Sequence, residues 1–592
     1  MQESFARQLL YLSGYLRPHK RVLAVSLLLS VISTGMGMVQ PLFAKFLIDK
    51  VLIAREYRLL VPLMAAVITL TIVSFLIRVS NGYIYTRYSA RVLFRMREDL
   101  FAHLQKVPLS FYSKRKIGDI FTRISSDMAD IQGLITETAP NYLFNFLTCV
   151  ITAGILVWLN WAMALMSFVF LPAAMYLVTR IRPKLVDLGR SMAESNSDIA
   201  HFLLESLSGM SLIRAFGAEK LERAKLNEKQ SGIMDLLLRY QVLGAFSGSI
   251  PILSTIINTL VVFGYGGSLV IQGSLSIGSL VAFTIYQGRV FAPLQGLMEG
   301  YLGMQKAKVA LRRVREILDV APAFQEHGGV VPETGILEGA IAFEKVGFAY
   351  EKEEPVLSDL SFRIPAGKVT AIVGPSGVGK TTLCHLIMRL FDPDSGRITL
   401  DGIDLKKYKV EWLRKQIALV SQDTFLFHTT ILENIRFSKP EAPLQDIVDA
   451  SKAACIHEFI ESLPEQYHTV VGDRGVRLSG GQKQRISIAR SVLMEPKVLI
   501  LDEATAFLDA SAEQRLKTTL HDLMRDKTVV VVSHRPSAIE WADKIIAIES
   551  GRLIYDGTAR GFFEKGSGVP ASEESMAGRE EVRKGPWPLT SP

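Results

Sequence analysis

The sequence predicts a multidomain membrane protein in which an all-α transmembrane domain of six helices precedes an α/β domain. Three observations support this prediction. Six apolar stretches in the first half are each long enough to cross a bilayer, which takes about 20 residues. An ordered series of phosphate-binding and acidic motifs lies between Tyr350 and His534. The length of 592 residues also exceeds what one compact core supports, so at least two domains are expected.

Composition indicates a membrane, and not nucleic acid, as the partner of the basic residues. Hydrophobic residues make up 49% of the chain, which is high for a soluble protein, and the formal net charge is +9. The Lys and Arg side chains lie mainly between the apolar stretches, where they would meet the anionic cytoplasmic face of a membrane. Cys149, Cys384 and Cys455 form no C-x-x-C pair, so we expect neither a disulfide framework nor a zinc site.

The distribution of cations orients the six predicted spans. We place these spans near residues 21–45, 59–82, 139–159, 162–181, 245–271 and 278–301. The second-to-third and fourth-to-fifth connections are long and rich in Arg and Lys, whereas the other three are short. By the positive-inside rule, the long connections and both termini are cytoplasmic. We therefore expect a cytoplasmic segment at 1–20, running into the first span without a cleavable signal peptide, and a transmembrane domain at 21–320.

Polar side chains within the sixth predicted span mark a candidate substrate cavity. Arg289 lies about eleven residues into this span, roughly mid-bilayer at about 1.5 Å per residue. An unpaired cation there costs at least about 2.5 kcal/mol, so we expect an anionic partner or a hydrated cavity. Gln287 and Gln295 lie nearby, and this mixture favours an amphipathic substrate. Arg78 and Glu299 lie near span ends, from which their side chains can reach the interface.

A glycine-rich motif in the second half has the spacing of a P-loop. It reads Gly374-Pro375-Ser376-Gly377-Val378-Gly379-Lys380-Thr381 and is followed by Thr382. We expect it between a strand at 368–373 and a helix at 382–390, so that backbone N–H groups surround phosphate oxygens. Lys380 would reach the β- and γ-phosphates, and the Thr381 hydroxyl would bind Mg²⁺. The motif predicts an α/β P-loop nucleotide-binding domain over 340–565, with ATP and Mg²⁺ as its ligands.

Two carboxylates follow a buried strand further along this domain. Residues 498–501 form a continuous apolar run, as expected for a strand buried on both faces, and Asp502 and Glu503 follow it. One carboxylate would balance Mg²⁺, while the other would orient and polarise an attacking water. A second β-rich run, at 528–532, ends close to His534.

The motif Leu478-Ser479-Gly480-Gly481-Gln482 completes a series that resembles the nucleotide-binding domain of ABC transporters. Residues 15–565 as a whole resemble an exporter-type half-transporter, similar to bacterial lipid flippases and multidrug exporters. The resemblance implies that Glu503 is the general base, that adenine stacks on Tyr350, and that the 478–482 motif meets the ATP of a second subunit. It implies Thr381, Gln422 and Asp502 as the Mg²⁺ site. The implied catalytic residues are Glu503, His534, Gln422 and Lys380, and the implied ATP-binding residues are Tyr350, Gly374, Pro375, Ser376, Gly377, Val378, Gly379, Lys380, Thr381, Thr382, Ser479, Gly480, Gly481 and Gln482.

The resemblance also implies how the transporter is organised. Residues 110–119 and 205–216 resemble the two coupling elements of exporters, and a Gly/Pro-punctuated linker at 321–339 leads into the cassette. One cassette and six spans require a second half-transporter subunit. The complete set of ATP-site residues favours a homodimer, with a heterodimer as the alternative. Phe507 departs from the family pattern because it replaces a small residue at the expected dimer seam.

The favoured function is ATP-driven export or flipping of a hydrophobic or amphipathic substrate, such as a lipid or a drug, by alternating access. We expect a bacterial inner-membrane protein whose cassette and termini are cytoplasmic, with a disordered tail at 566–592. An ATP-gated channel or regulatory membrane protein without net pumping is the alternative from another class, and a peptide is the alternative substrate. The six spans argue against a soluble ABC ATPase of translation or DNA repair.

Overall fold

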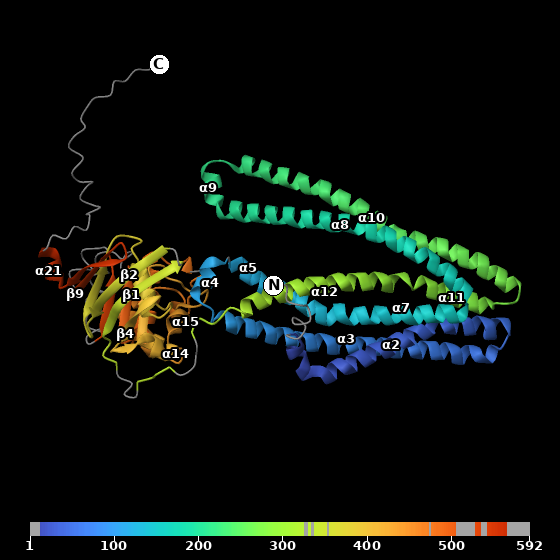
Figure 1. Ribbon diagram of the computed structural model, residues 1–592, viewed down its shortest axis with the longest axis horizontal. Coiled ribbons are helices and arrows are strands. Elements are labelled where there is room, and N and C mark those ends of the chain that lie inside the picture. Colours follow the sequence, from blue (N-terminus) through green and yellow to red (C-terminus); the bar gives the residue numbers. More distant parts are fainter. Residues whose placement is uncertain are drawn as a thin grey trace, which may run out of the picture. The chain divides into compact units, whose positions relative to one another are not determined.

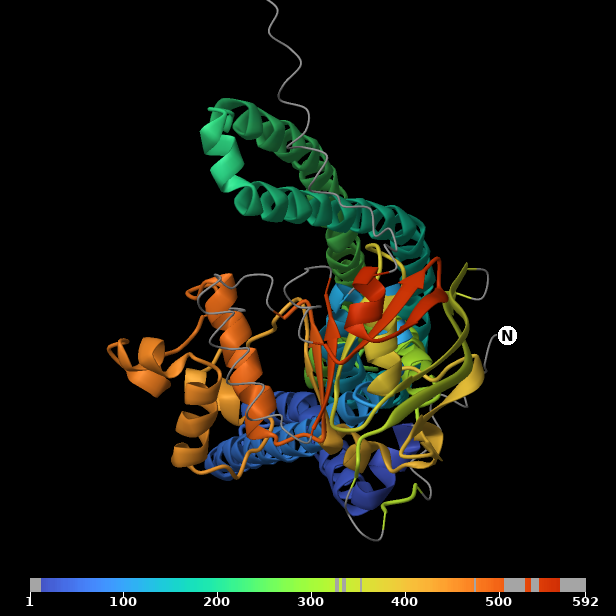
Figure 2. The ribbon, with the colours of Figure 1, turned by 90° about the vertical axis from the view of Figure 1, so that its left-hand side faces the viewer.

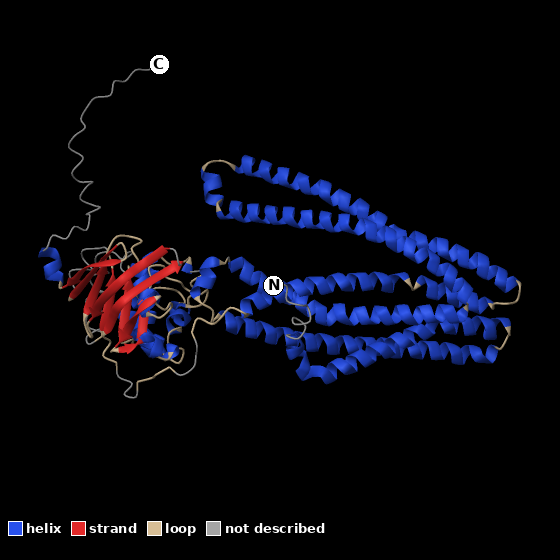
Figure 3. Ribbon diagram, in the orientation of Figure 1, coloured by secondary structure: helices blue, strands red, loops and turns tan. Residues whose placement is uncertain are grey.

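The computed structural model describes residues 12–115, 117–324, 329–332, 337–351, 354–472, 475–504, 527–533 and 542–564. Contacts divide the chain into two units. The membrane unit comprises Met1–Leu104 and Ile117–Val320, and the cassette unit comprises Gln105–Lys116 and Ala321–Pro592. Among the described residues, the membrane unit is built from helices, and the strands belong to the cassette unit (Figure 3).

Long helices lie alongside one another in the membrane unit (Figure 1). Within the described part of the chain, five helical stretches are long and apolar enough to cross a membrane: Lys20–Ile53, Tyr57–Leu104, Ile117–Leu159, Trp161–Ser208 and Glu219–Ile271. Their principal helices are α2 (Lys20–Phe46), α3 (Leu60–Leu104), α7 (Ala139–Leu159), α8 (Trp161–Ser208) and α10 (Glu219–Ile271). These positions agree with the first five predicted spans.

Several of these helices are much longer than a bilayer requires. The 53 residues of α10 would extend about 80 Å at 1.5 Å per residue, against a hydrocarbon core of about 30 Å. Short helices lie in the long connections: α4 (Leu109–Lys114), α5 (Ile117–Thr122), α6 (Met128–Gly133) and α9 (Met210–Ala215). Helix α9 forms the turn between α8 and α10 (Figure 1). The two long connections between the predicted spans are therefore largely helical within the described residues.

The sixth predicted span is not one continuous helix, which corrects the sequence prediction. It is divided into α11 (Ile277–Gly288) and α12 (Phe291–Leu318). At the break, the Arg289 N–H donates to Tyr286 O at 3.0 Å, three residues back, so the α-helical ladder ends there. Pro293 explains the break, because it has no N–H to donate to the Arg289 carbonyl and its ring crowds that carbonyl.

The cassette unit contains two sheets. The first is antiparallel, in the order β2-β1-β4-β5, from β1 (Ile341–Glu351), β2 (Glu354–Ile364), β4 (Ser395–Leu400) and β5 (Ile403–Asp404). The second has the order β10-β9-β3-β8-β7-β6, and its pairs are parallel except that β10 is antiparallel to β9. Its strands are β3 (Val369–Val373), β6 (Ile417–Val420), β7 (Val498–Asp502), β8 (Thr528–Val532), β9 (Lys544–Glu549) and β10 (Arg552–Gly557).

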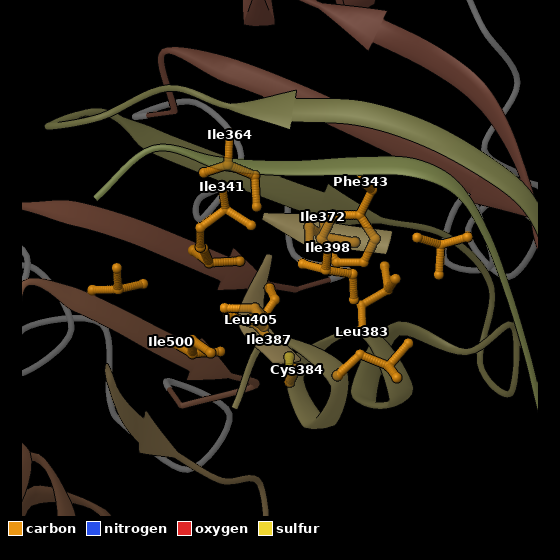
Figure 4. Packing of buried hydrophobic residues seen from close by; sticks show 14 of the residues in the cluster. Ile341, Phe343, Ile364, Ile372, Leu383, Cys384, Ile387, Ile398, Leu405 and Ile500 are labelled. Carbon is orange, nitrogen blue, oxygen red and sulfur yellow. The ribbon is translucent and has the colours of Figure 1, made fainter. Parts of the chain in front are cut away.

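Helices cover the second sheet and complete the core. They are α13 (Lys380–Ile387), α14 (Val410–Gln416), α15 (Ile431–Arg436), α16 (Leu444–Ala453), α17 (His457–Glu461), α18 (Gly480–Leu493) and α21 (Ala559–Glu564). Helices α15 to α18, in orange, gather at one side of the sheet (Figure 2). Between the two sheets, α13 buries Leu383, Cys384 and Ile387 against strand residues such as Ile372 (Figure 4). The P-loop helix is thereby fixed at the centre of the core.

Candidate active site

The P-loop joins the C-terminal end of β3 to the N-terminus of α13. Gly374, Gly377 and Gly379 have φ values of +158°, +82° and +102°, which side-chain-bearing residues rarely adopt. A Cβ at Gly374 would also lie 2.3 Å from the carbonyl oxygen of Ile548, so the backbone passes where only glycine fits. The strand is found as predicted, but α13 begins at Lys380, two residues earlier than predicted, and ends at Ile387.

Lys380 lies inside this loop. Its side chain is buried, and Nζ donates to the carbonyl oxygens of Gly374 and Pro375, at 2.8 Å each. Burial lowers the pKa of Lys380, while the nearby carboxylates of Glu503 and Asp502 oppose that shift. A largely desolvated ammonium group bonded to two neutral carbonyls is well suited to an anionic ligand, because a phosphate would stabilise its charge more strongly.

The two predicted carboxylates lie beside the P-loop. Asp502 ends β7, is buried, and accepts a hydrogen bond from the Thr381 side chain. Burial raises the pKa of Asp502, and the Thr381 bond lowers it. Glu503 follows with φ +49°, held by its N–H donating to Val532 O at 2.9 Å. The constrained backbone turns Glu503 away from the strand direction.

Gln422 comes from a different strand end and meets Glu503. It follows β6 by two residues, and its Nε2 donates to Glu503 Oε2 at 2.7 Å. Strands β6 and β7 are parallel neighbours, so their carboxyl ends lie at the same edge of the sheet. The structure therefore brings Lys380, Thr381, Asp502, Glu503 and Gln422 into one place, as the sequence predicts.

Tyr350 lies next to the first turn of α13. Its hydroxyl is 3.1 Å from Thr382 Oγ1 and 3.5 Å from His385 Nδ1. Phe348 and Phe391 pack edge-on against its ring, with centroids at 5.0 and 5.4 Å. The ring is 43% exposed, so it retains a face that can stack on a base. Burial lowers the pKa of His385, and the Asp502 carboxylate opposes this.

The signature motif forms the N-terminus of α18. The Ser479 side chain accepts from the Gln482 N–H at 3.3 Å, and Gln482 Oε1 accepts from the Ser479 N–H at 2.8 Å. This capping box starts α18 at Gly480, inside the signature motif. The spacing Ser-x-x-Gln was the available signal for this start.

Gln484 is a site residue that sequence reasoning missed. It is buried in α18, and its Nε2 donates to the Glu503 carbonyl at 3.2 Å. Its Oε1 is buried and accepts no hydrogen bond from the described residues. The available signal in the sequence was a long polar residue on the buried side of α18, which otherwise carries apolar residues and serines. Gln484 holds the backbone of Glu503, while Gln422 holds its carboxylate.

Two residues of the sequence prediction lie outside the described residues: His534 and Phe507. Strand β8 ends at Val532, and Ser533 follows it as a buried residue whose N–H donates to Ile372 O at 3.4 Å. The chain therefore enters the segment that contains His534 from the strand adjacent to both β3 and β7.

The predicted cavity residues of the sixth span lie at the α11–α12 break and beyond it. Arg289 donates to the Gly37 carbonyl at 3.0 Å and to Gln40 Oε1 at 3.1 Å, and no acidic partner is found among the described residues. Gln287 is buried, and its two amide atoms have no hydrogen-bond partner in the described chain. Gln295 lies on an exposed face of α12.

Comparisons with known proteins agree with this arrangement. Residues 23–294 match the family described as the ABC transporter transmembrane region, and residues 357–506 match the ABC transporter family. A putative multidrug export ATP-binding/permease protein of Bacillus subtilis, YgaD, is 35% identical over 555 residues, covering 92% of this chain and 95% of the relative. A Staphylococcus aureus protein of the same description, SAOUHSC_02003, is 33% identical over 559 residues, covering 93% and 96%.

A solved structure shares the architecture as well. It is a bacterial Atm1-family ABC exporter with ATP bound, with a TM-score of 0.78, 26% identity, and coverage of 95% of this chain and 99% of that one. Family models match both units of the chain, and the relatives align with almost its whole length. These matches together identify its family. The chain belongs to the ABC transporter family, as a multi-pass membrane half-transporter of the exporter type that joins one membrane region to one ATP-hydrolysing cassette.

Proposed function

We propose that the protein exports or flips a hydrophobic or amphipathic substrate across the bacterial inner membrane, using ATP binding and hydrolysis to alternate the access of a cavity between its spans. The observation that carries this proposal is the Gln422–Glu503 hydrogen bond beside Lys380 and Asp502, in a chain whose other half has helices of membrane-spanning length. The relatives named as putative multidrug export proteins support export as the direction of transport.

The proposed hydrolytic roles follow from the positions of the side chains. Backbone N–H groups of the P-loop and Lys380 bind the phosphates, and Tyr350 stacks on the adenine. Glu503 takes a proton from the attacking water, with its carboxylate oriented by Gln422 at 2.7 Å and its backbone held by Gln484. His534 is proposed as the contact to the γ-phosphate.

A magnesium ion fits the oxygen donors near the P-loop. The Thr381 hydroxyl, the Asp502 carboxylate and the Gln422 amide oxygen are the hard oxygen ligands that Mg²⁺ prefers. The hydrogen bond from Thr381 to Asp502 supports their convergence. When bound, Mg²⁺ would neutralise charge on the phosphates, and the buried Asp502 would then have a positive partner that offsets its desolvation.

A homodimer would complete two such sites. The exposed first turn of α18, capped by Ser479, presents backbone N–H groups and a helix N-terminus suited to the phosphates of an ATP bound by a second copy. Because this chain carries the P-loop, the base and the signature motif, two identical copies could hydrolyse both ATP molecules.

The substrate cavity is proposed to include Arg289, Gln287 and Gln295. The unpartnered Gln287 amide needs a polar partner, which water, substrate or a second subunit can supply. Arg289 retains N–H groups beyond those given to Gly37 and Gln40. An anionic amphiphile, such as a lipid with a charged headgroup, fits a cavity that offers both a guanidinium group and polar amides.

The proposal is tested by ATPase activity of the purified protein in liposomes, screened over lipids, hydrophobic drugs and peptides, with Glu503→Gln as the inactive control. We expect at least one amphiphile to stimulate the wild type and none to stimulate the variant. Stimulation by peptides alone would replace the proposed substrate class, and equal ATPase activity of wild type and variant would refute the assignment of the base.

A further inference from the structure

The Gly/Pro-punctuated linker that follows the membrane unit is bonded to the rest of the cassette unit at several points. The Ala323 N–H donates to Lys106 O at 2.7 Å, within the cassette unit. Further along, the Val330 N–H donates to Lys407 O at 2.7 Å, and Val330 O accepts from the Lys409 N–H at 3.2 Å. Backbone bonds on both sides of Phe324 thus hold the linker against the cassette.

Phe324 attaches the described part of this linker to the cassette through its side chain. The guanidinium carbon of Arg389 lies 5.1 Å from its ring centroid, and that of Arg414 lies 5.2 Å away. Both distances are within the range of a cation–π interaction, which is favourable because each cation faces the ring's negative quadrupole. Two cations that would repel each other are therefore held around one aromatic ring.

Arg389 is held in place by several contacts and follows the C-terminal end of the P-loop helix α13. It is 8% exposed, and its Nη1 donates to the carbonyls of Leu405 at 3.0 Å and Tyr408 at 3.1 Å. Its Nε donates to Asp392 at 3.3 Å. Its φ of +48° is in the left-handed region, and α13 ends just before it. An exposed arginine with a mobile side chain would not make this many hydrogen bonds.

Arg414 bonds to the backbone of Arg389 and also lies against the Phe324 ring. Its Nη2 donates to the Arg389 carbonyl at 3.0 Å, and its Nε is buried without a hydrogen-bond partner among the described residues. Burial, and then the charge of Arg389, lower the pKa of Arg414. The Phe324 ring lies against both cations, and the Asp392 carboxylate, 3.3 Å from Arg389, offsets the charge of one of them.

We propose that Phe324 is a positioning residue that couples the P-loop helix to the membrane unit through Arg389 and Arg414. Helix α13 has eight residues, with the phosphate-binding Lys380 first and Arg389 two residues beyond its last. A short helix moves as a rigid rod, so a shift at its phosphate end reaches Arg389, then Phe324, and then the chain that continues from α12. This inference rests on the proposed ATP-driven transport cycle, because it concerns how the nucleotide state reaches the spans.

The test compares hydrogen–deuterium exchange of the full-length protein in nanodiscs with and without ATP plus orthovanadate. The readout is the nucleotide-dependent change in exchange at α11 and at the turn 272–276, together with the dissociation constant of a fluorescent ATP analogue. We expect Phe324→Leu to reduce the change about fivefold or more while leaving nucleotide affinity within about twofold of wild type. Phe324→Tyr keeps the π face and should retain the wild-type response.

Two further variants separate coupling from stability. Ile398→Val removes one methylene from the same cassette core and should keep the full response despite a lower melting temperature. Arg414→Gln leaves the linker sequence intact and should reduce the nucleotide-dependent change in exchange as much as Phe324→Leu does. It therefore provides the test if Phe324→Leu folds poorly. A wild-type response in Phe324→Leu or in Arg414→Gln, or equal losses in Phe324→Leu and Phe324→Tyr, would overturn the coupling role alone. Absence of any nucleotide response in the wild type would overturn it together with the proposed transport cycle.

Discussion

Arg289 stabilises a proline-containing segment of the first span, and this role yields a prediction that can be tested by a double-mutant cycle. Pro41 lies inside α2 and has no N–H for the carbonyl of Gly37, four residues earlier. The Arg289 guanidinium donates to that carbonyl at 3.0 Å and to Gln40 at 3.1 Å. The nearby Tyr286 hydroxyl donates to the next carbonyl, that of Met38.

The expected cost of losing Arg289 follows from the two hydrogen bonds. Hydrogen bonds between membrane helices average about 0.6 kcal/mol and reach about 1.7 kcal/mol, so Arg289→Met should cost between about 1 and 3 kcal/mol. Pro41→Ala restores an N–H to the α2 ladder, which gives the Gly37 carbonyl its own partner. In that background Arg289→Met should cost about half as much, an interaction energy of about 0.5–1.5 kcal/mol.

The assay is the apparent melting temperature of the purified protein in nanodiscs for the wild type, both single variants and the double variant. At about 2.1 cal/mol/K of unfolding entropy per residue, a difference of 1 kcal/mol corresponds to roughly 1 °C in a chain of 592 residues. Pro172→Ala, in α8, is the matched control, because its effect should simply add to that of Arg289→Met. Additivity between Pro41→Ala and Arg289→Met would refute the explanation that Arg289 replaces the missing backbone donor.

The remaining predictions concern the cassette. Ser479→Arg should prevent ATP-dependent cross-linking between two cassettes while nucleotide binding to the P-loop persists, and unchanged cross-linking would contradict the proposed dimer. Gly374→Ala should abolish ATP binding, because its Cβ would lie 2.3 Å from Ile548 O, whereas Gly402→Ala, which has backbone strain at φ +80° but open space around its Cβ, should keep binding. Burial lowers the pKa of His385, so its contribution to stability is present above its unfolded pKa of about 6.5 and is lost as the pH falls. The melting temperature should therefore drop less between pH 7.5 and pH 5.5 in His385→Asn than in the wild type, and equal drops would contradict this.

The sequence predicted those parts of the site that depend on local spacing. The P-loop, the acidic pair at the end of β7 and the strand on each side of them are encoded by contiguous residues, and the structure places them as expected. Gln422 was predicted only through the family resemblance, since its contact with Glu503 joins two different strand ends.

Three features depended on tertiary contacts that local patterns do not reveal. The sixth span reads as one apolar helix, but Pro293 breaks it at a depth where Arg289 is held by α2. The linker was predicted only from its glycines and prolines, and the contacts of Phe324 with two arginines distant in the sequence carry no local signal. Arg289 was expected to have an anionic partner or a hydrated cavity, and among the described residues its partners are Gln40 and the Gly37 carbonyl, which Pro41 leaves without a backbone donor.

The central claim is that hydrolysis at Glu503 drives net movement of an amphiphile, and transport into sealed inside-out vesicles tests it most directly. The probes are a fluorescent anionic phospholipid analogue and a cationic dye, each followed with Mg²⁺ and ATP. We predict ATP-dependent accumulation or flipping of at least one probe by the wild type, and none by Glu503→Gln, which should still bind ATP because its phosphate contacts are intact. ATP hydrolysis by the wild type without movement of either probe, or equal transport by the variant, would contradict the account.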